Sequence, residues 1–383
     1  MKIMLAPDSF KGSMTSIEAA EAMKKGIHRY DTNIEVSSFP LADGGEGTID
    51  ALTYGTNMKL MKVPTLDPLG REMTGYFAYD DQKQIAVIET AVASGLTLLA
   101  PHERNPLFTS TEGTGLIFRQ AVAHGAKEII IGIGGSATVD GGAGFLQGLG
   151  VRFHDASGQR LHRIGGQLDQ IHTIDTSAMI DIPEDLTIKA ATDVTNRLLG
   201  KEGAVYIFGL QKGMIDEDLP VYEKGMAHFA ELTKQMTGVD HRDTPGSGAA
   251  GGLGFALLSY LDAELRRGFE MIAESVGIME AIHEADLIMS GEGKLDEQTL
   301  FGKGPIGVAT IAADAGKPVI LFGGMRTRIF DEKIRDWDHV VSCTLISDRT
   351  DVNQMMKEGP ARLEDEVYRV MKTIDIGREW PKR

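Results

Sequence analysis

Cysteine is almost absent from this sequence, which has Cys343 alone among 383 residues. A single thiol excludes an intrachain disulfide and any metal site built from several thiolates. No run of eighteen apolar residues occurs, so no segment is expected to cross a bilayer as a helix. The apolar stretch Ile3–Ala6 ends at Pro7 and is too short for a signal peptide. These absences predict a cytoplasmic protein.

Positive charge is also scarce, with 39 Lys and Arg against 55 Asp and Glu and a net charge of −16. A chain this acidic repels nucleic acids and anionic membranes at long range, so we expect it to bind neither. An anionic substrate would have to be held by local donors, such as backbone N–H groups, a few placed cations or a metal. The sequence contains no GxxxxGK[ST] string, which excludes a standard P-loop.

Glycine is abundant, at 46 residues, while the 42% hydrophobic and 25% charged contents are ordinary for a folded protein. The length exceeds what one hydrophobic core normally holds and predicts two domains. Strand-like and helix-like segments alternate over residues 2–56 and again from residue 285, which is typical of a parallel α/β sheet. We therefore expect an α/β domain made of residues 1–64 plus 285–383, and an inserted domain at 65–284.

The inserted region begins with a change of character. Residues 63–70 contain two prolines and a glycine and are predicted to form a hinge. Residues 71–79 and 84–89 alternate in hydrophobicity around a short turn and predict an antiparallel hairpin. A mixed sheet is therefore expected, with the ligand in the cleft between the two domains.

Two early loops carry polar residues after predicted strands. Asp8, Ser9 and Lys11 precede a helix whose N-terminus would favour a small carboxylate or phosphate. Asp43 and Glu46 flank two glycines and suit Mg²⁺ or sugar-type hydroxyls. The alternative is a pair of ordinary polar turns. Because the two strands are predicted neighbours, both loops should share one edge of the sheet.

A third loop is the densest in glycine, with eight in residues 131–150, which we call the glycine tract. It contains Gly134, Gly135, Ser136, Thr138 and Asp140. The composition predicts a cradle for a triphosphate whose metal is held by hydroxyl and carboxylate groups. Glycines used only for close packing would be an unusual explanation for so many.

The same tract fits a different binding motif. Gly132, Gly134 and Ala137 match the G-x-G-x-x-G/A fingerprint of dinucleotide-binding folds, and Asp155 lies about twenty residues further on. This pattern would indicate an NAD-dependent hydroxyacid dehydrogenase. A non-enzymatic protein that binds small anions is a further alternative.

Two later segments carry acidic and basic residues. Asp193 directly follows a predicted strand and could accept a proton from an attacking hydroxyl or bind Mg²⁺, although an Asx turn would look the same. Residues 290–304 are predicted to form a polar loop between a strand and a helix. This loop carries Glu292, Lys294, Asp296 and Lys303.

Eight segments in this order resemble the type I glycerate kinases of bacteria over nearly the whole chain. They are APDSFKGS, PLADGGEGT, ETAVASGL, STEGTG, GIGGSATVDGG, ATDVTN, GAAGGLG and SGEGKLDEQTLFGKGPIGVA. The resemblance implies phosphorylation of D-glycerate by ATP with Mg²⁺, usually at the 2-hydroxyl. It also implies one flavodoxin-like (Rossmann-like) α/β domain and a second domain of mixed topology. Where the family usually has Asn-Pro, this chain has Asn196 and Arg197, and the arginine could contact phosphate.

The resemblance and the residue chemistry together give a working hypothesis of direct in-line phosphoryl transfer by a monomer or homo-oligomer. The predicted glycerate-binding residues are Asp8, Ser9, Lys11, Asp43, Glu46 and Glu292. The predicted ATP-binding residues are Gly134, Gly135, Ser136, Thr138, Asp140 and Lys303. Asp193 is predicted to be the base or, with Asp140, a Mg²⁺ ligand, and Lys294 and Asp296 complete the catalytic set. Lys294 or Lys303 would neutralise charge on the transferring group.

Overall fold

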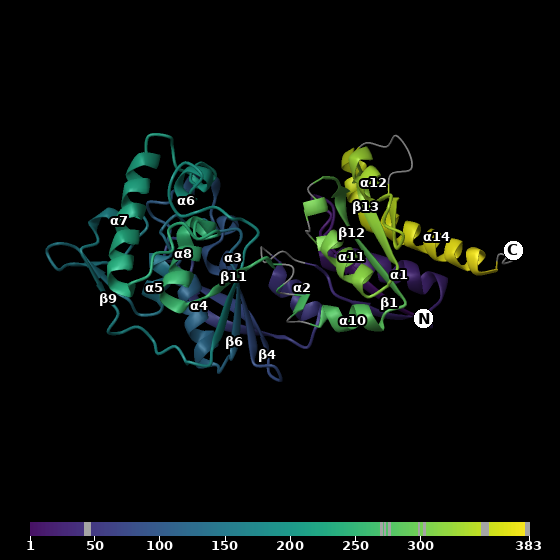
Figure 1. The fold of residues 1–383 in the computed structure, drawn as a ribbon, viewed down its shortest axis with the longest axis horizontal. Coiled ribbons are helices and arrows are strands. Elements are labelled where there is room, and N and C mark those ends of the chain that lie inside the picture. The colour runs from purple at the N-terminus through teal and green to yellow at the C-terminus, as the bar shows by residue number, and fades with distance from the viewer. Residues whose placement is uncertain are drawn as a thin grey trace. The chain divides into compact units, whose positions relative to one another are not determined.

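The structure is a computed structural model that describes residues 1–41, 47–268, 271, 273–274, 277–297, 299–301, 304–345 and 352–379. The chain divides into two compact units, each with its own sheet (Figure 1). The first unit comprises Met1–Ala42, Asp50–Thr56 and Phe269–Arg383, and the second comprises Asp43–Ile49 and Asn57–Gly268. None of the described helices is both long and apolar enough to cross a membrane.

The first unit is built on a five-stranded parallel sheet in the order β14-β13-β12-β1-β2. Its strands are β1 (Lys2–Pro7), β2 (Glu35–Ser38), β12 (Leu287–Leu295), β13 (Val319–Arg326) and β14 (Val340–Thr344). Numbered along the chain within this sheet alone, the order is 2-1-3-4-5, which is the flavodoxin-like order. The expectation of a flavodoxin-like parallel domain is confirmed.

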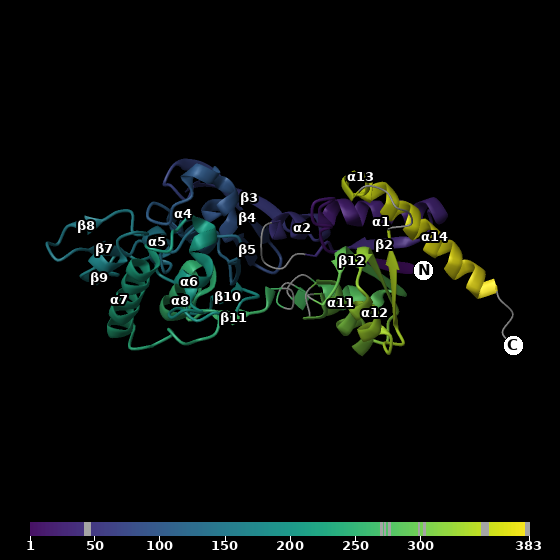
Figure 2. The same cartoon turned by 90° about the horizontal axis from the view of Figure 1, so that it is seen from above.

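Helices cover both faces of this sheet, with α1 and α14 on one face and α11 and α12 on the other (Figure 2). The helices are α1 (Ser16–Tyr30), α10 (Ile278–Glu284), α11 (Gly304–Asp314), α12 (Arg328–Ile334), α13 (Val352–Lys357) and α14 (Gly359–Glu379), while α2 (Thr48–Gly55) includes residues of both units. Alternate strand residues such as Ile3, Leu5 and Phe322 pack against α1 and α14 in one buried core. Alternation along the strands therefore sends the intervening side chains to the opposite face.

The polar loop predicted at 290–304 is partly wrong, because β12 continues as a strand to Leu295. Strand pairing explains the extension: Lys294 and Leu295 lie opposite Met325 and Arg326 of β13. The neighbouring strand thus supplies backbone partners that the polar composition of this segment does not reveal.

The second unit has a six-stranded sheet in the order β11-β10-β6-β5-β4-β3. Its strands are β3 (Lys59–Leu66), β4 (Glu72–Asp80), β5 (Ile85–Glu89), β6 (Glu128–Gly132), β10 (Thr187–Ala191) and β11 (Glu264–Arg266). β11, β10, β6 and β5 run parallel, while β5 with β4 and β4 with β3 are antiparallel. The expected mixed sheet and the hairpin of residues 71–79 and 84–89 are confirmed.

The hinge predicted at 63–70 is wrong in its first half. Residues 63–66 belong to β3, and Pro64 lies opposite Thr74 of β4. β3 is an edge strand, and a proline is tolerated there because one side of the strand has no neighbour that needs its N–H group. The proline therefore marks an edge and does not interrupt the strand.

The remaining elements of the second unit include several that the sequence did not reveal. Its helices are α3 (Thr90–Ser94), α4 (Glu112–Ala123), α5 (Ala143–Gly148), α6 (Ala204–Phe208), α7 (Leu219–Thr237) and α8 (Ala249–Leu261). A second, small sheet in this unit consists of β7 (Arg152–His154), β8 (Arg160–Leu161) and β9 (Thr173–Asp175).

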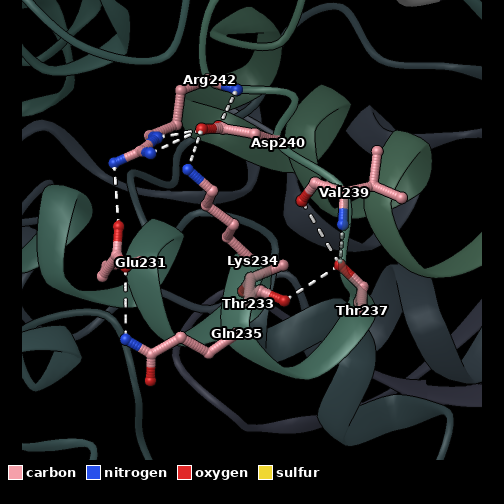
Figure 3. Close-up of polar contacts among 8 residues, drawn as sticks. All are labelled: Glu231, Thr233, Lys234, Gln235, Thr237, Val239, Asp240 and Arg242. Carbon is pink, nitrogen blue, oxygen red and sulfur yellow. Dashed lines mark hydrogen bonds and ion pairs between the residues drawn. The ribbon is translucent and has the colours of Figure 1, made fainter.

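A group of charged side chains holds the chain where α7 ends (Figure 3). Arg242 donates to Asp240 from Nε at 2.8 Å and pairs with Glu231 at 3.2 Å, and Lys234 Nζ lies 3.2 Å from Asp240. The carbonyl of Arg242 accepts the N–H of Leu198 at 3.0 Å. The group therefore helps to fix the segment that follows β10.

Candidate active site

The carboxyl ends of three parallel strands form one edge of the large sheet in the second unit. Glu89 of β5, Gly132 of β6 and Ala191 of β10 lie opposite one another in the ladder. The glycine tract and Asp193 therefore begin at the same edge. Ligands of parallel α/β sheets bind at this edge, beyond the carboxyl ends of the strands.

The glycine tract leaves β6 through a turn at Gly134 and Gly135. The turn is fixed by two hydrogen bonds, from Leu96 N–H to the Gly135 carbonyl (2.9 Å) and from Ala137 N–H to the Ser94 carbonyl (2.8 Å). Gly135 is exposed and has φ +72°, a conformation that favours glycine. Within the described part of the chain, the N–H groups of Gly134 and Gly135 have no acceptor. Free N–H groups at a turn of this kind make a concave site for an anion.

A buried lysine contacts the segment that follows this turn. Lys212 ends a short 3₁₀ helix and is 4% exposed. Its Nζ donates to Ser136 Oγ at 2.7 Å and to the Thr138 carbonyl at 2.8 Å. Burial lowers the pKa of Lys212 to about 7, and the negative charge of Asp140 opposes that shift.

Asp140, predicted as a phosphate-site residue and metal ligand, lies inside the protein. Its carboxylate accepts the N–H and hydroxyl of Thr111, both at 2.8 Å, and the N–H groups of Gly142 (3.1 Å) and Gly144 (3.3 Å). Burial raises the pKa of Asp140, and these hydrogen bonds act in the opposite direction. Because four donors already engage the carboxylate, its geometry favours fixing the tract over binding a metal.

Two further polar groups are buried in this unit. The hydroxyl of Thr138 has no hydrogen-bond partner in the described part of the chain, although the residue is fully buried. Glu89 accepts the N–H of Gly47 at 3.3 Å and also that of Ile49, and it is 3% exposed. Buried polar groups usually have a hydrogen-bond partner, so the Thr138 hydroxyl is an exception in this unit.

Asp193 is exposed and lies two residues after the end of β10. The next turn is held by Asn196, whose Nδ2 donates to the Glu202 carbonyl at 2.8 Å. Arg197, which could have contacted phosphate, pairs instead with Asp243 at 3.3 Å. Asp193 therefore lies at the tract edge, whereas Arg197 forms an ion pair with Asp243.

The dinucleotide fingerprint does not have its structural context here. No helix follows Ala137, since α5 begins only at Ala143. Asp155 closes a local turn by accepting the N–H groups of Ser157 (2.8 Å) and Gln159 (2.9 Å). An acidic residue engaged in this way does not fit the ribose-binding role that the fingerprint requires.

In the first unit, residues after β1 and near the end of β12 lie side by side at the point where the strand order reverses. The N–H of Asp8 donates to the Gly291 carbonyl at 2.8 Å, and Ser9 N–H donates to the Asp8 carboxylate at 2.6 Å. Glu292 follows Gly291 in β12. Asp8, Ser9 and Glu292 are therefore brought together at this edge, whereas the predicted partner loop with Asp43 and Glu46 lies outside the described residues.

The predicted catalytic pair of this unit forms an ion pair. Lys294 Nζ lies 2.9 Å from Asp296 Oδ2, with side chains 55% and 16% exposed. The hydrogen bond that Lys294 donates to Asp296 raises the pKa of Lys294. The ammonium is therefore charged and reachable from solvent.

The N-terminus of α1 does not offer the free donors that were expected for an anion. A capping box closes this helix end: Glu18 N–H donates to Thr15 Oγ1 (3.1 Å) and Thr15 N–H to Glu18 Oε2 (2.8 Å). An acidic side chain thus already occupies this helix end. Lys11, which is exposed, is the cation that remains available in the loop.

Lys11 also borders a cavity of about 110 Å³ in the first unit. Phe10, Met14 and Met325 contribute to its largely apolar wall, and Arg362 adds a second cation. An apolar wall offers little to a small, highly polar acid.

Known proteins resemble this chain over both units. The model of the Glycerate kinase family matches residues 3–375. The chain is 44% identical to the glycerate kinase of Bacillus subtilis over 86% of both chains, and 42% identical to the glycerate 2-kinase of Escherichia coli K12 over 85% of this chain and 86% of that one. It superposes with a TM-score of 0.87 at 37% identity, over the full length of both chains, on a crystal structure from Salmonella typhimurium LT2 assigned as glycerate kinase 2.

This chain belongs to the glycerate kinase family. The match covers both units, so the fold and the predicted family resemblance are confirmed, and the chain is a member of a family of kinases.

The predicted residues of this glycerate kinase family member fall into two described groups. Asp8, Ser9, Lys11, Glu292, Lys294 and Asp296 belong to the first unit, and Gly134, Gly135, Ser136, Thr138, Asp140 and Asp193 to the second. Asp43, Glu46 and Lys303 lie outside the described residues. Across the part of the chain that the structure describes, no group of three His, Cys, Asp or Glu side chains is arranged to hold a metal ion.

Sequence reasoning missed two polar residues at the tract edge. Glu89 ends the buried strand β5, and the rule that selected Asp193 after β10 would have found it. Lys212 carries no local signal, because only the folded chain brings it to Ser136.

Proposed function

We propose that this member of the glycerate kinase family transfers the γ-phosphoryl group of ATP to the 2-hydroxyl of D-glycerate. The products are 2-phosphoglycerate and ADP. The relatives named glycerate kinase and glycerate 2-kinase support the acceptor and the position. The observation that carries the proposal is the exposed turn at Gly134 and Gly135. Its N–H groups are free, and the Lys212 ammonium donates a hydrogen bond to the adjacent Ser136.

The glycine tract would bind phosphate oxygens of the nucleotide. The N–H groups of Gly134 and Gly135 and the hydroxyl of Ser136 are donors at one turn, and none of them adds negative charge. Phosphoryl transfer depends mainly on positioning and on stabilising charge at the phosphoryl oxygens. This turn supplies both in a protein whose net charge of −16 would otherwise repel the nucleotide.

Asp193 would act as the base. Its carboxylate takes the proton of the 2-hydroxyl as that oxygen bonds to the γ-phosphorus and the bond from phosphorus to the bridging oxygen of ADP breaks. A positioned base of this kind contributes about 10²–10⁴ in rate. The exposed position of Asp193 beyond the carboxyl end of β10 supports this role.

Of the two predicted Mg²⁺ ligands, Asp193 fits the ion and Asp140 does not. Asp193 is an exposed residue beyond the carboxyl end of β10, whereas four donors surround the buried carboxylate of Asp140. Mg²⁺ would supply charge neutralisation for the nucleotide phosphates.

Glycerate would bind through Lys11, Asp8, Ser9 and Glu292, with the carboxylate of the substrate on the Lys11 ammonium and its hydroxyls on the acidic groups. Lys294, oriented by Asp296, would neutralise charge on the transferring group. The roles given to Asp43, Glu46 and Lys303 stay predictions.

The test is an ADP-release assay with D-glycerate and Mg²⁺, with NMR of the product to distinguish phosphorylation at the 2- and 3-hydroxyls. Wild-type protein is expected to release ADP only with an acceptor and to form 2-phosphoglycerate. Asp193→Asn should reduce kcat by at least about a hundredfold. Asp185→Asn is the matched control, because Asp185 precedes β10 whereas Asp193 follows it. A 3-phosphoglycerate product, or near-native turnover of Asp193→Asn, would contradict the proposal.

A further inference from the structure

Lys212 is a buried cation for which the proposed reaction gives no direct role. Its side chain is 4% exposed, and among the described acidic residues none forms a salt bridge with it. Its polar contacts are Ser136 Oγ and the Thr138 carbonyl, and its Nζ lies 6.0 Å from the centre of the Phe208 ring. Both hydrogen-bond partners belong to the glycine tract.

An ammonium in this position is unfavourable for folding alone. Removing a charge from water is costly unless a paired carboxylate compensates, and a neutral side chain of similar length would fill the same space. The charged group acting on Lys212 is Asp140, which is itself buried and held by four other donors. The position therefore carries an electrostatic cost that packing does not explain.

The donor arrangement directs the hydroxyl of Ser136. A lysine ammonium only donates, so Ser136 Oγ must be the acceptor of the 2.7 Å bond. The hydroxyl proton of Ser136 has no acceptor in the described part of the chain. A hydroxyl that accepts from a cation is also polarised and becomes a stronger donor. Ser136 directly follows Gly134 and Gly135 in the chain, so its hydroxyl adds a donor to the same segment as their free N–H groups.

We propose that Lys212 is a positioning residue for phosphate oxygens: it holds Ser136 and Thr138 in place and orients the Ser136 proton toward a nucleotide phosphate bound at the Gly134–Gly135 turn. This inference rests on the proposed function, since it takes the tract as the phosphate site. Lys212 acts through Ser136 and does not itself touch the substrate.

The direct test compares Lys212→Met, Ser136→Ala and the double variant, each measured for kcat, for KM of ATP and of glycerate, and for the free energy of unfolding in urea. We expect Lys212→Met to raise KM for ATP by about tenfold or more while KM for glycerate changes little. The free energy of unfolding at pH 7 should change little, because removing the buried charge offsets the loss of its hydrogen bonds to Ser136 and Thr138. The double variant should be no worse than Lys212→Met alone, since both changes remove the same interaction.

A binding arm separates this inference from the proposed function. Calorimetric titration with ADP measures binding without turnover. Repeating it at pH 8 in buffers of different ionisation enthalpy gives the number of protons that the protein takes up when ADP binds. Burial lowers the pKa of Lys212 to about 7, so Lys212 is mostly neutral at pH 8 in the free protein and should take up a proton when the anion binds. Lys212→Met should not take up these protons. A structural role would not produce this difference.

Lys127→Met is the matched control, because Lys127 directly precedes β6 whereas the tract follows it, and it pairs with Asp185 at the surface. It should change neither ATP affinity nor proton uptake. The inference is overturned if Lys212→Met destabilises the fold without changing ADP affinity, or if its effects and those of Ser136→Ala simply add. If wild-type protein binds ADP with proton uptake but phosphorylates no hydroxyacid, the proposed reaction fails while the role of Lys212 stands.

Discussion

Two loops of this protein carry the same sequence signal but differ in structure. Residues 8–13 and residues 133–142 of the glycine tract each follow a parallel strand, combine glycine with serine, and precede a helix. Both patterns predict an anion site on sequence grounds. The difference lies in whether the donors of each loop are already engaged.

At the first loop, the donors of the helix N-terminus are engaged internally. Glu18 and Thr15 form a capping box, which places a carboxylate where an anionic ligand would have to bind. At the tract, Gly134 and Gly135 keep free N–H groups, and the buried cation Lys212 contacts the same segment. An anion site therefore requires unsatisfied donors as well as the right residue types.

The largest expected effect concerns Asp140, which fixes the tract. Asp140→Ala removes the acceptor for Thr111, Gly142 and Gly144 in a fully buried position. Buried donors left without a partner are costly, so we expect the free energy of unfolding to fall by about 3 kcal/mol or more. Urea unfolding at pH 7 measures this change.

The control for Asp140 is Asp155→Ala, at an exposed carboxylate that also accepts several hydrogen bonds from neighbouring backbone and Ser157. Water replaces these bonds at the surface, so the loss should be much smaller. If the Asp140→Asn variant kept wild-type stability but its turnover no longer responded to Mg²⁺ as that of wild type does, Asp140 would be a metal ligand and not a structural group.

The second prediction compares two glycines with the same backbone conformation. Gly135 in the tract has φ +72° and Gly12 in the first loop has φ +80°. An added Cβ would meet only ordinary contacts, at 3.4 Å from Ala91 and 3.6 Å from Met356. Alanine at either position should therefore destabilise the protein by about 1–2 kcal/mol, through backbone strain alone.

Ligand binding should separate these two variants. Gly135→Ala disturbs a turn whose N–H groups are free, and we expect its affinity for ADP to fall by about tenfold. Gly12→Ala should leave ADP affinity unchanged. Calorimetric titration of both variants with ADP measures these affinities. An equal loss of ADP affinity in the two variants would contradict the assignment of the nucleotide to the tract alone.

The third prediction concerns the capping box of α1. Glu18→Gln keeps an acceptor for Thr15 but removes the negative charge at the helix N-terminus, so stability should fall by about 0.5–1 kcal/mol. KM for glycerate should not change. A marked decrease in that KM would mean that the carboxylate of the substrate binds at the helix N-terminus after all, since removing Glu18 charge would strengthen such a site.

Local patterns in the sequence predicted much of the fold. The hairpin at 71–89 depends on neighbours within a few residues, and it is present. Two elements depend on distant pairing instead. Residues 63–66 become a strand through β4, and residues 290–295 through β13, and neither partner is visible in the local composition.

The candidate site was predictable to the same extent. Glycine and serine content pointed to the tract, and strand ends pointed to Asp193. The inward orientation of Asp140 and the contact of Lys212 with Ser136, 76 positions apart in the sequence, arise from tertiary packing. Composition identifies which groups are present, whereas packing determines which of them are already satisfied.

The smallest expected effect lies at the end of α7, away from both loops. The hydrogen bond from Arg242 holds the pKa of Asp240 below its usual range, with a further contribution from Lys234. A lowered carboxyl pKa stabilises the fold above the unfolded pKa of about 3.9 and loses that contribution as the pH falls through the folded value. Asp240→Asn should therefore cost about 0.5–1 kcal/mol at pH 7, since these groups are partly exposed, and the difference from wild type should shrink as the pH is lowered toward 3. Urea titrations at several pH values measure it. Turnover should change little, so a large loss of kcat would show that the hydrogen bond from Leu198 to Arg242 positions Asp193 as well as the chain around it.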